Sequence, residues 1–82
     1  MKQLTDKDRL KVREIIGDKL GYDLEEIQPT TDLRDVLGAD SLDEVEIVME
    51  LEKEFDCIIP DGDYEQATIV ADYYDCLQKN MR

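Results

Sequence analysis

The chain has 82 residues, enough for a single domain over residues 1–82 with a thin hydrophobic core. It contains no histidine and only two cysteines, so the commonest general base and most metal-ligand sets are missing, and we expect neither an enzyme nor a metal site. The formal net charge of −12 repels nucleic acid and anionic membranes and favours partners with basic surfaces.

Cysteine spacing and hydrophobicity predict where the protein resides. Cys57 and Cys76 lack the CxxC spacing of metal and redox sites, so we expect reduced thiols rather than a disulfide. No apolar run is long enough to span a membrane, and the first residues, Met1 to Asp6, contain no hydrophobic stretch suited to secretion. These features predict a cytoplasmic protein without stable membrane insertion, and we expect a monomer.

The segment from Thr5 to Leu20 is predicted to form the first helix. Thr5 and Asp8 have the spacing of an N-terminal cap, and Leu10 falls on the side expected to be exposed. Apolar residues recur at helical spacing on the opposite side, at Val12, Ile15, Ile16 and Leu20. The first twenty residues also carry six of the ten basic side chains, so the acidic charge is concentrated in the rest of the chain.

An irregular stretch from Gly21 to Asp40 predicts a long connection. A loop of this length in a compact domain is normally functional or held down by its own apolar residues. The expected anchors are Leu24, Ile27, Leu33 and Leu37. Asp32 and Gly38 further predict a short helical turn from Leu33 to Leu37.

The stretch from Ser41 to Phe55 is predicted to be the strongest helix. Its expected core face consists of Val45, Ile47, Val48, Leu51 and Phe55. The opposite side is occupied by Asp43, Glu46, Glu50, Lys53 and Glu54. Leu42 and Met49 fall on the boundary beside these charged residues, away from the centre of the core face.

The last quarter of the chain predicts a turn, a short segment and a final helix. Asp61-Gly62-Asp63 is the expected turn, Tyr64 to Ala67 the short segment, and Thr68 the cap of the final helix. The apolar arc of that helix is Ile69, Val70, Tyr73, Tyr74 and Leu77. No alternating strand pattern is present, so the fold class is all-α: a small bundle of three main helices plus one or two short ones.

Ser41 is the only serine in the chain, and it lies where the long connection meets the second helix. Ser41 and Glu44 have the spacing of a capping box, in which the hydroxyl would only satisfy a backbone N–H group. Asp40 can equally act as the cap, which would leave the Ser41 hydroxyl free for chemistry. Local capping rules leave both registers open.

The run Gly38-Ala39-Asp40-Ser41-Leu42-Asp43, with the pattern that follows it to Phe55, resembles the phosphopantetheine attachment motif of bacterial acyl carrier proteins. The likeness extends to the first helix, from Val12 to Gly21, and to Phe55-Asp56 and Ile59-Pro60-Asp61. It implies that a separate transferase, using coenzyme A and magnesium, attaches 4′-phosphopantetheine covalently to Ser41. The thiol of the arm would then hold acyl groups as thioesters, and the protein would shuttle them between enzymes of fatty-acid biosynthesis.

The resemblance also suggests a role for the acidic run Asp43, Glu44, Glu46, Glu50, Glu52, Glu54 and Asp56. Such a run is often only a solvated helix face. Beside a modification site it predicts a docking surface for the transferase and for acyl-processing synthases with basic patches. The expected docking residues are Asp40, Leu42, Asp43, Val45, Glu46, Met49 and Glu52.

Several alternatives remain at this level. The motif fits a specialised carrier for polyketide, peptide or D-alanyl transfer equally well, and a plain acidic interaction domain is also possible. A calcium sensor is suggested by Asp61 to Glu65, but Gln66 stands where the calcium loop needs glycine and Asp72 where glutamate is usual. The chain departs from the family pattern at Gly62, Tyr64, Ala67 and Tyr73-Tyr74. In carriers of this family these positions border the cleft that shelters an acyl chain, so the identity of the cargo and the depth at which it is buried are left open. Lys53 also departs from the family pattern, because it replaces an acidic residue within the surface expected to contact partners.

Overall fold

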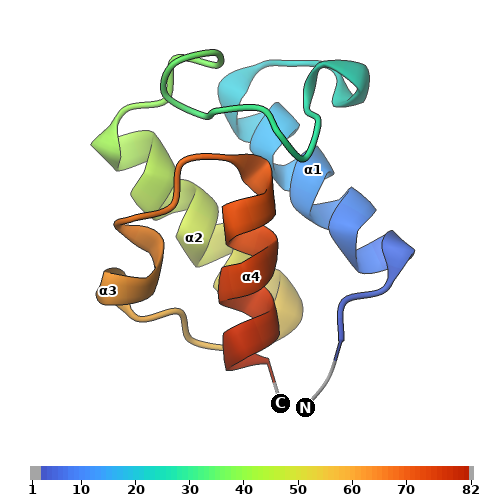
Figure 1. Ribbon diagram of the computed structural model, residues 1–82, viewed down its shortest axis with the longest axis vertical. Coiled ribbons are helices and arrows are strands. Elements are labelled where there is room, and N and C mark those ends of the chain that lie inside the picture. The colour runs from blue at the N-terminus through green and yellow to red at the C-terminus, as the bar shows by residue number, and fades with distance from the viewer. Residues whose placement is uncertain (1–2, 82) are drawn as a thin grey trace.

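The computed structural model describes residues 3–81, and within them the secondary structure is helical. The elements are α1 (Asp6–Leu20), a 3₁₀ turn η1 (Leu24–Glu26), α2 (Ser41–Phe55), α3 (Asp61–Tyr64) and α4 (Val70–Asn80). In Figure 1 the long connection between α1 and α2 crosses one end of the bundle, and α4 ends at the opposite end. The predicted bundle of three main helices with short additions is confirmed. Over residues 3–81, no helix combines the length and the apolar character that crossing a membrane requires.

The first helix begins as its sequence predicts. The Thr5 hydroxyl accepts a hydrogen bond from the Asp8 N–H at 3.1 Å, and the Asp8 carboxylate accepts one from the Thr5 N–H at 3.0 Å. This reciprocal capping box satisfies two N–H groups that a helix start otherwise leaves free. Leu10 is exposed, as expected. A side chain at Gly17 would place its Cβ 2.7 Å from the backbone oxygen of Tyr22, so only glycine lets the chain fold back there.

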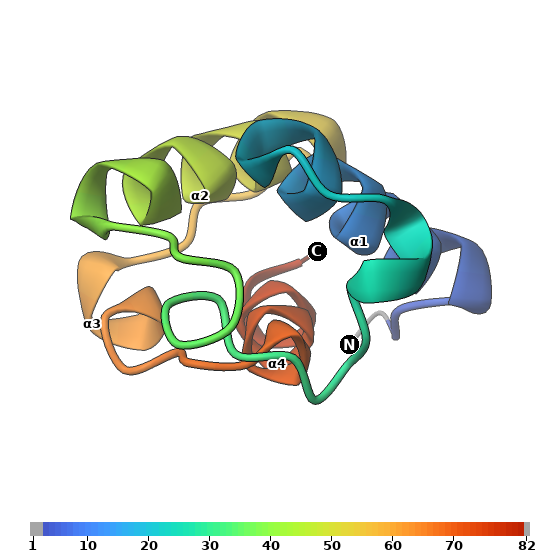
Figure 2. The same cartoon turned by 90° about the horizontal axis from the view of Figure 1, so that it is seen from above.

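One hydrophobic core joins α1, α2, α4 and the connection. Figure 2 shows the bundle from above, with the connection crossing the end of the bundle that faces the viewer. Ile27, Leu33 and Leu37 are buried as predicted. Leu24 was expected as a fourth anchor, which is wrong, because its side chain is 36% exposed. Arg13 instead fastens this part of the connection through the main chain, since its guanidinium donates to the carbonyl oxygens of Ile27 at 2.6 Å and Leu24 at 3.2 Å.

The segment from Leu33 to Leu37 forms the predicted short helical turn, with N–H groups of Val36 and Gly38 donating to the carbonyl oxygens four residues earlier, and it does not extend into a regular helix. The Asp32 carboxylate accepts from the N–H groups of Arg34 and Asp35, so the expected cap is present. The helical turn ends here because the Ala39 N–H donates a hydrogen bond to the Leu33 carbonyl at 2.9 Å, which reverses the chain. Gly38 allows this reversal with a φ of +75°, a conformation that suits glycine.

Backbone hydrogen bonds tie the connection to the start of α4. The Leu33 N–H donates to the Thr68 carbonyl, and the Val70 N–H donates to the Thr31 carbonyl, both at 3.0 Å. These bonds produce an isolated antiparallel bridge between Asp32 and Ile69. The loop beside the second helix is therefore held on the bundle by main-chain contacts as well as by its buried side chains.

Two boundaries near the C-terminus differ from the prediction. The expected turn Asp61–Asp63 forms the first residues of α3, since Pro60 has a φ of −60° compatible with a helix entry and the acids suit a first turn. The short segment Tyr64 to Ala67 contributes only Tyr64 to that helix. Thr68 does not cap α4, which begins at Val70 after the N-cap position Ile69.

Asp72 secures the start of α4 in place of Thr68. Its Oδ2 accepts hydrogen bonds from the N–H groups of Thr68 at 2.8 Å and Ile69 at 3.1 Å, and from the Thr68 hydroxyl at 3.2 Å. The Thr68 backbone N–H lowers the pKa of Asp72 below its ordinary 3.8, with help from Ile69 and the Thr68 hydroxyl. A depressed carboxyl pKa stabilises the fold above the unfolded-state pKa, and this contribution is lost as the pH falls through the folded-state value.

Asp72→Asn is therefore expected to lower the free energy of unfolding by about 1 kcal/mol at pH 7, because the neutral amide oxygen accepts these hydrogen bonds more weakly than the carboxylate does. The difference from the wild type should shrink as the pH falls below the unfolded-state value of 3.8, and it should be lost once the pH has passed through the lower folded-state value, where the native carboxyl is protonated as well. Denaturant unfolding across this pH range measures it. Asp75→Asn, at an exposed position on the same helix, is the control and should change stability little. An Asp72 effect that is independent of pH would contradict the explanation.

Candidate functional site

Ser41 is the first residue of α2, at the end of the bundle crossed by the connection (Figure 1). Asp40 is the N-cap: its Oδ1 accepts from the Asp43 N–H at 2.9 Å, and Asp43 Oδ2 accepts from the Asp40 N–H at 3.1 Å. Of the two registers that the sequence left open, the structure has the one with Asp40 as cap. Ser41 is exposed, and its hydroxyl takes part in no hydrogen bond within residues 3–81.

An exposed hydroxyl that is not used for capping is free to be esterified. The helix start also places the positive end of the α2 macrodipole beside it, which favours a phosphodiester by a few tenths to about 1 kcal/mol. The carboxylates of Asp40 and Asp43 oppose this, although each is engaged in the capping box. The geometry at Ser41 therefore fits a covalently attached phosphate group.

Glu44 differs from its expected place in the solvent-facing acidic run. It is 7% exposed, and its carboxylate pairs with the Arg34 guanidinium through two hydrogen bonds, Nε to Oε1 at 2.9 Å and Nη2 to Oε2 at 2.6 Å. Hydrogen bonding to Glu44 raises the pKa of Arg34 above its ordinary value, which already keeps an arginine charged in proteins. The pair joins the connection to the first turn of α2, next to Ser41.

The sequence contained a signal for this pair. At 100° per residue, Glu44 projects between Leu51 and Val48, in the middle of the core arc. A carboxylate there needs a cationic partner, and Arg34 is the only basic residue between Lys19 and Lys53. Val45 was placed on the core face, which is wrong: it lies beyond the edge of the arc and is 38% exposed.

Breaking the pair should destabilise the protein more than removing both partners. Arg34→Met leaves the buried Glu44 carboxylate uncompensated, and we expect Tm to fall by at least about 5 °C. The double variant Arg34→Met/Glu44→Leu should recover most of that loss, because apolar groups can replace a buried pair with little effect. Thermal unfolding of the wild type, both single variants and the double variant measures the coupling; additive changes in Tm would show that the pair has no energetic role.

The remaining docking candidates are distributed around the solvent side of α2. Leu42, Val45 and Met49, at 67%, 38% and 61% exposure, follow one another on successive turns, and we call them the apolar ridge. Val36 and Ile58 are also large, apolar and exposed, and no sequence signal distinguished them from core residues. An apolar strip of this kind at a helix surface is typical of a contact site for other proteins.

The acids near the ridge have intramolecular contacts. Glu46 forms an ion pair with Lys19 of α1 at 3.2 Å, and the Glu52 carboxylate accepts a hydrogen bond from the Ile59 N–H at 2.7 Å. Asp40 is exposed, whereas Asp43 is half-buried, and both belong to the capping box. These acids therefore have structural roles in addition to any contact with a partner.

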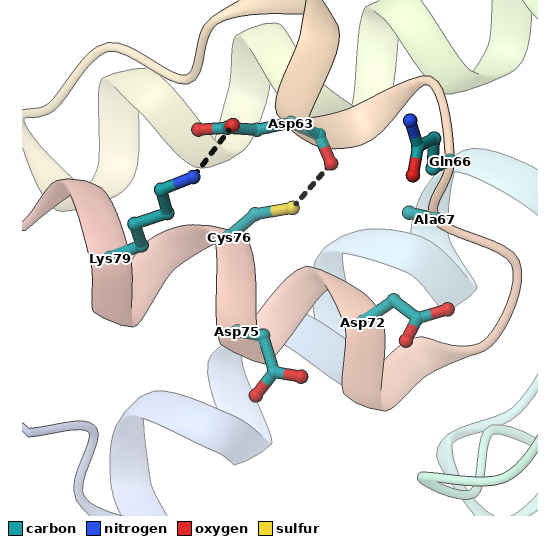
Figure 3. A pocket seen from close by; sticks show the side chains of 7 residues that line it. All are labelled: Asp63, Gln66, Ala67, Asp72, Asp75, Cys76 and Lys79. Atoms are coloured by element: carbon teal, nitrogen blue, oxygen red, sulfur yellow. Dashed lines mark hydrogen bonds and ion pairs between the residues drawn. The ribbon is translucent and has the colours of Figure 1, made fainter.

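A surface opening lies between α3 and α4, and Figure 3 shows its lining. The Lys79 ammonium pairs with the Asp63 carboxylate at 3.1 Å, and the Cys76 thiol donates to the Asp63 backbone oxygen at 3.3 Å. Burial raises the pKa of Cys76 to about 11, so it stays a protonated thiol at neutral pH and is a poor nucleophile. These contacts hold α3 on α4 and do not form a reactive centre.

Comparison with known proteins identifies the family to which this chain belongs. The model of the family described as "Phosphopantetheine attachment site" matches residues 10–77, a span that includes Ser41. The chain is also 50% identical over 72 residues to the acyl carrier protein of Syntrophobacter fumaroxidans, covering 88% of this chain and 89% of the relative. The chain belongs to the acyl carrier protein family.

Two further acyl carrier proteins support the assignment. That of Chlorobium phaeobacteroides is 48% identical over 69 residues, and that of Chlorobium luteolum is 48% identical over 71 residues. The matches cover 84% and 87% of this chain and 88% and 91% of the relatives. Members of this family carry 4′-phosphopantetheine covalently, and the resemblance inferred from the motif is confirmed.

Proposed function

We propose that this acyl carrier protein takes its phosphopantetheine arm on the Ser41 hydroxyl and carries acyl groups as thioesters of the arm's thiol. The observation that supports Ser41 most strongly is its free, exposed hydroxyl at the first residue of α2, within the family match. The chain then acts as a carrier between enzymes and not as a catalyst. A role in fatty-acid biosynthesis fits the family, and a place in the cytoplasm stays a prediction.

The apolar ridge and the acids around Ser41 are proposed as the docking surface for a transferase and for acyl-processing synthases. Complementary charge accelerates encounter and sets orientation without requiring tight binding, which suits a carrier that must dissociate after each transfer. Met49 has a flexible, polarizable side chain that can adapt to several partners. Docking of basic partner surfaces is therefore expected to depend on ionic strength.

Intact-mass measurement after incubation with coenzyme A, magnesium and a phosphopantetheinyl transferase of broad specificity tests the proposal. We expect one arm per chain, and peptide mapping should place it on the fragment containing Ser41. An unchanged mass would contradict the carrier function and favour a plain acidic interaction domain. Acylated species isolated from the native host would then distinguish fatty-acid cargo from polyketide, peptide or D-alanyl cargo.

A further inference from the structure

Arg34 has hydrogen-bonding capacity that its pairing with Glu44 does not use. A guanidinium group carries five N–H donors in a planar fork. Nε and Nη2 each donate once to the Glu44 carboxylate, at 2.9 Å and 2.6 Å. The other donors of this side chain form no hydrogen bond within residues 3–81. The Arg34 side chain is 55% exposed and that of Glu44 only 9%, so a ligand outside the pair can reach the unused donors.

Two contacts hold Arg34 beside the first turn of α2. Its side chain is bound to Glu44, which lies three residues after Ser41, and side chains at this spacing are neighbours with Cβ atoms about 5–6 Å apart. Helical side chains lean toward the N-terminus of their helix, which inclines the Glu44 carboxylate toward the turn that contains Ser41. Its backbone carbonyl accepts a hydrogen bond from the Gly38 N–H at 3.1 Å, just before the chain enters α2. The guanidinium is therefore fixed in the surface region where an arm on Ser41 begins.

The charges around Ser41 leave Arg34 as the cation that suits a phosphodiester there. Arg34 is the only basic residue between Lys19 and Lys53, and Lys19 already pairs with Glu46 at 3.2 Å. The capping carboxylates at the helix start are acceptors and repel an anion. A phosphodiester accepts hydrogen bonds through two charged oxygens, which match the spacing of donors along one edge of a guanidinium fork.

We propose that Arg34 is a positioning residue for the phosphopantetheine arm, and that its unused donors bind the phosphodiester on Ser41 while Nε and Nη2 stay on Glu44. The inference rests on the proposed function, since the phosphodiester exists only when Ser41 carries the arm. Glu44 holds the guanidinium in place before the arm is attached, so little further ordering is needed to form the contact. The contact restrains the first group of the arm against the connection and gives the arm a preferred direction from α2.

The first test compares the wild-type chain before and after attachment of the arm by NMR of the arginine side chains. We expect the Arg34 N–H signals to shift and their exchange with water to slow by about threefold, within the range of an exposed charged pair. The Arg13 guanidinium, which donates to the carbonyl oxygens of Ile27 and Leu24, is the internal control and should not respond. Unchanged Arg34 signals in a chain that carries the arm on Ser41 would overturn the proposal without any variant.

The second test removes the pair. Arg34→Met/Glu44→Leu deletes one positive and one negative charge, so the local net charge is preserved. The ³¹P signal of the arm should then relax as fast-moving phosphodiesters do, and the change in Tm on attachment should be about 3 °C less favourable than in the wild type. Glu44→Leu is the matched control, because it keeps every donor of Arg34 and should retain the wild-type ³¹P relaxation.

Equal ³¹P relaxation and equal changes in Tm for the wild type and the double variant would contradict the contact. Loss of the restrained ³¹P signal in Glu44→Leu as well would contradict it in another way, by assigning the effect to Glu44. A chain that accepts no arm, or accepts it at another residue, contradicts the proposed function itself. A normally loaded chain with an unrestrained phosphate contradicts only the role of Arg34.

Discussion

Ser41→Ala is expected to abolish phosphopantetheine attachment while leaving the fold intact. The variant removes the only hydroxyl that the structure presents at the start of α2, so an incoming transferase finds no nucleophile there. Because Asp40 supplies the cap, the free energy of unfolding should change by less than about 0.5 kcal/mol. Intact mass after incubation with coenzyme A and transferase, together with denaturant unfolding, measures both effects.

Variants of Asp40 are the controls for this experiment. Asp40→Ala removes the cap and should destabilise α2 by about 1 kcal/mol while Ser41 remains available. Asp40→Asn keeps the cap and removes the charge, so it isolates the electrostatic role of Asp40. If Ser41→Ala still gained an arm, the attachment site would be elsewhere. If instead it lost as much stability as Asp40→Ala, the hydroxyl would have a capping role that the structure does not show.

Glu46→Lys is expected to slow modification by about tenfold at low salt, with the difference diminishing as salt screens the charges. Glu46 belongs to the proposed docking surface, and reversing its charge converts attraction of a basic partner into repulsion. The initial rate of arm transfer at several ionic strengths measures the effect. Glu25→Lys makes the same charge change at an exposed residue of η1 and should leave the rate nearly unaltered.

The ion pair between Glu46 and Lys19 gives this test a second arm. In the single variant two lysines face each other, so slow modification could follow from a disturbed α1–α2 contact. The swap Glu46→Lys/Lys19→Glu restores an ion pair with the charges exchanged. Transfer should stay slow in the swapped protein if Glu46 contacts partners. Recovery of the wild-type rate would assign Glu46 to the α1–α2 contact alone.

The first two long helices follow from local sequence signals. Thr5 with Asp8, and the apolar periodicity of Val12 and Ile16, predict α1 with its observed cap, and α2 has the predicted bounds. The start of α4 was predicted at the wrong residue, because it depends on contacts with a segment about forty residues earlier in the chain. The Val70 N–H donates to Thr31 and thereby fixes where the helix begins. Capping rules applied to neighbours cannot include such a contact.

The candidate site was only partly predictable for a similar reason. Ser41 stands out by its motif, but Asp40 and Ser41 are equally good caps, and only the three-dimensional path of the connection decides between them. The burial of Glu44 could have been predicted from a helical wheel. Its partner Arg34 could not, because it is ten residues away on a turn whose geometry the sequence did not establish. The hydroxyl of Tyr73, which is buried without a hydrogen-bond partner in the described chain, could not be foreseen, because an apolar arc identifies a buried ring and not the surroundings of its oxygen.

Two lysines of α1 pair with acidic side chains along one side of α2. Lys19 pairs with Glu46 at 3.2 Å and Lys11 with Glu54 at 3.9 Å, so the acids along the α1 side are partly neutralised from within the molecule. The apolar ridge runs along the middle. The surface that we propose for docking therefore differs in charge across its width as well as along its length. We infer that a partner docked on this surface would meet the Ser41 end of the helix from one direction.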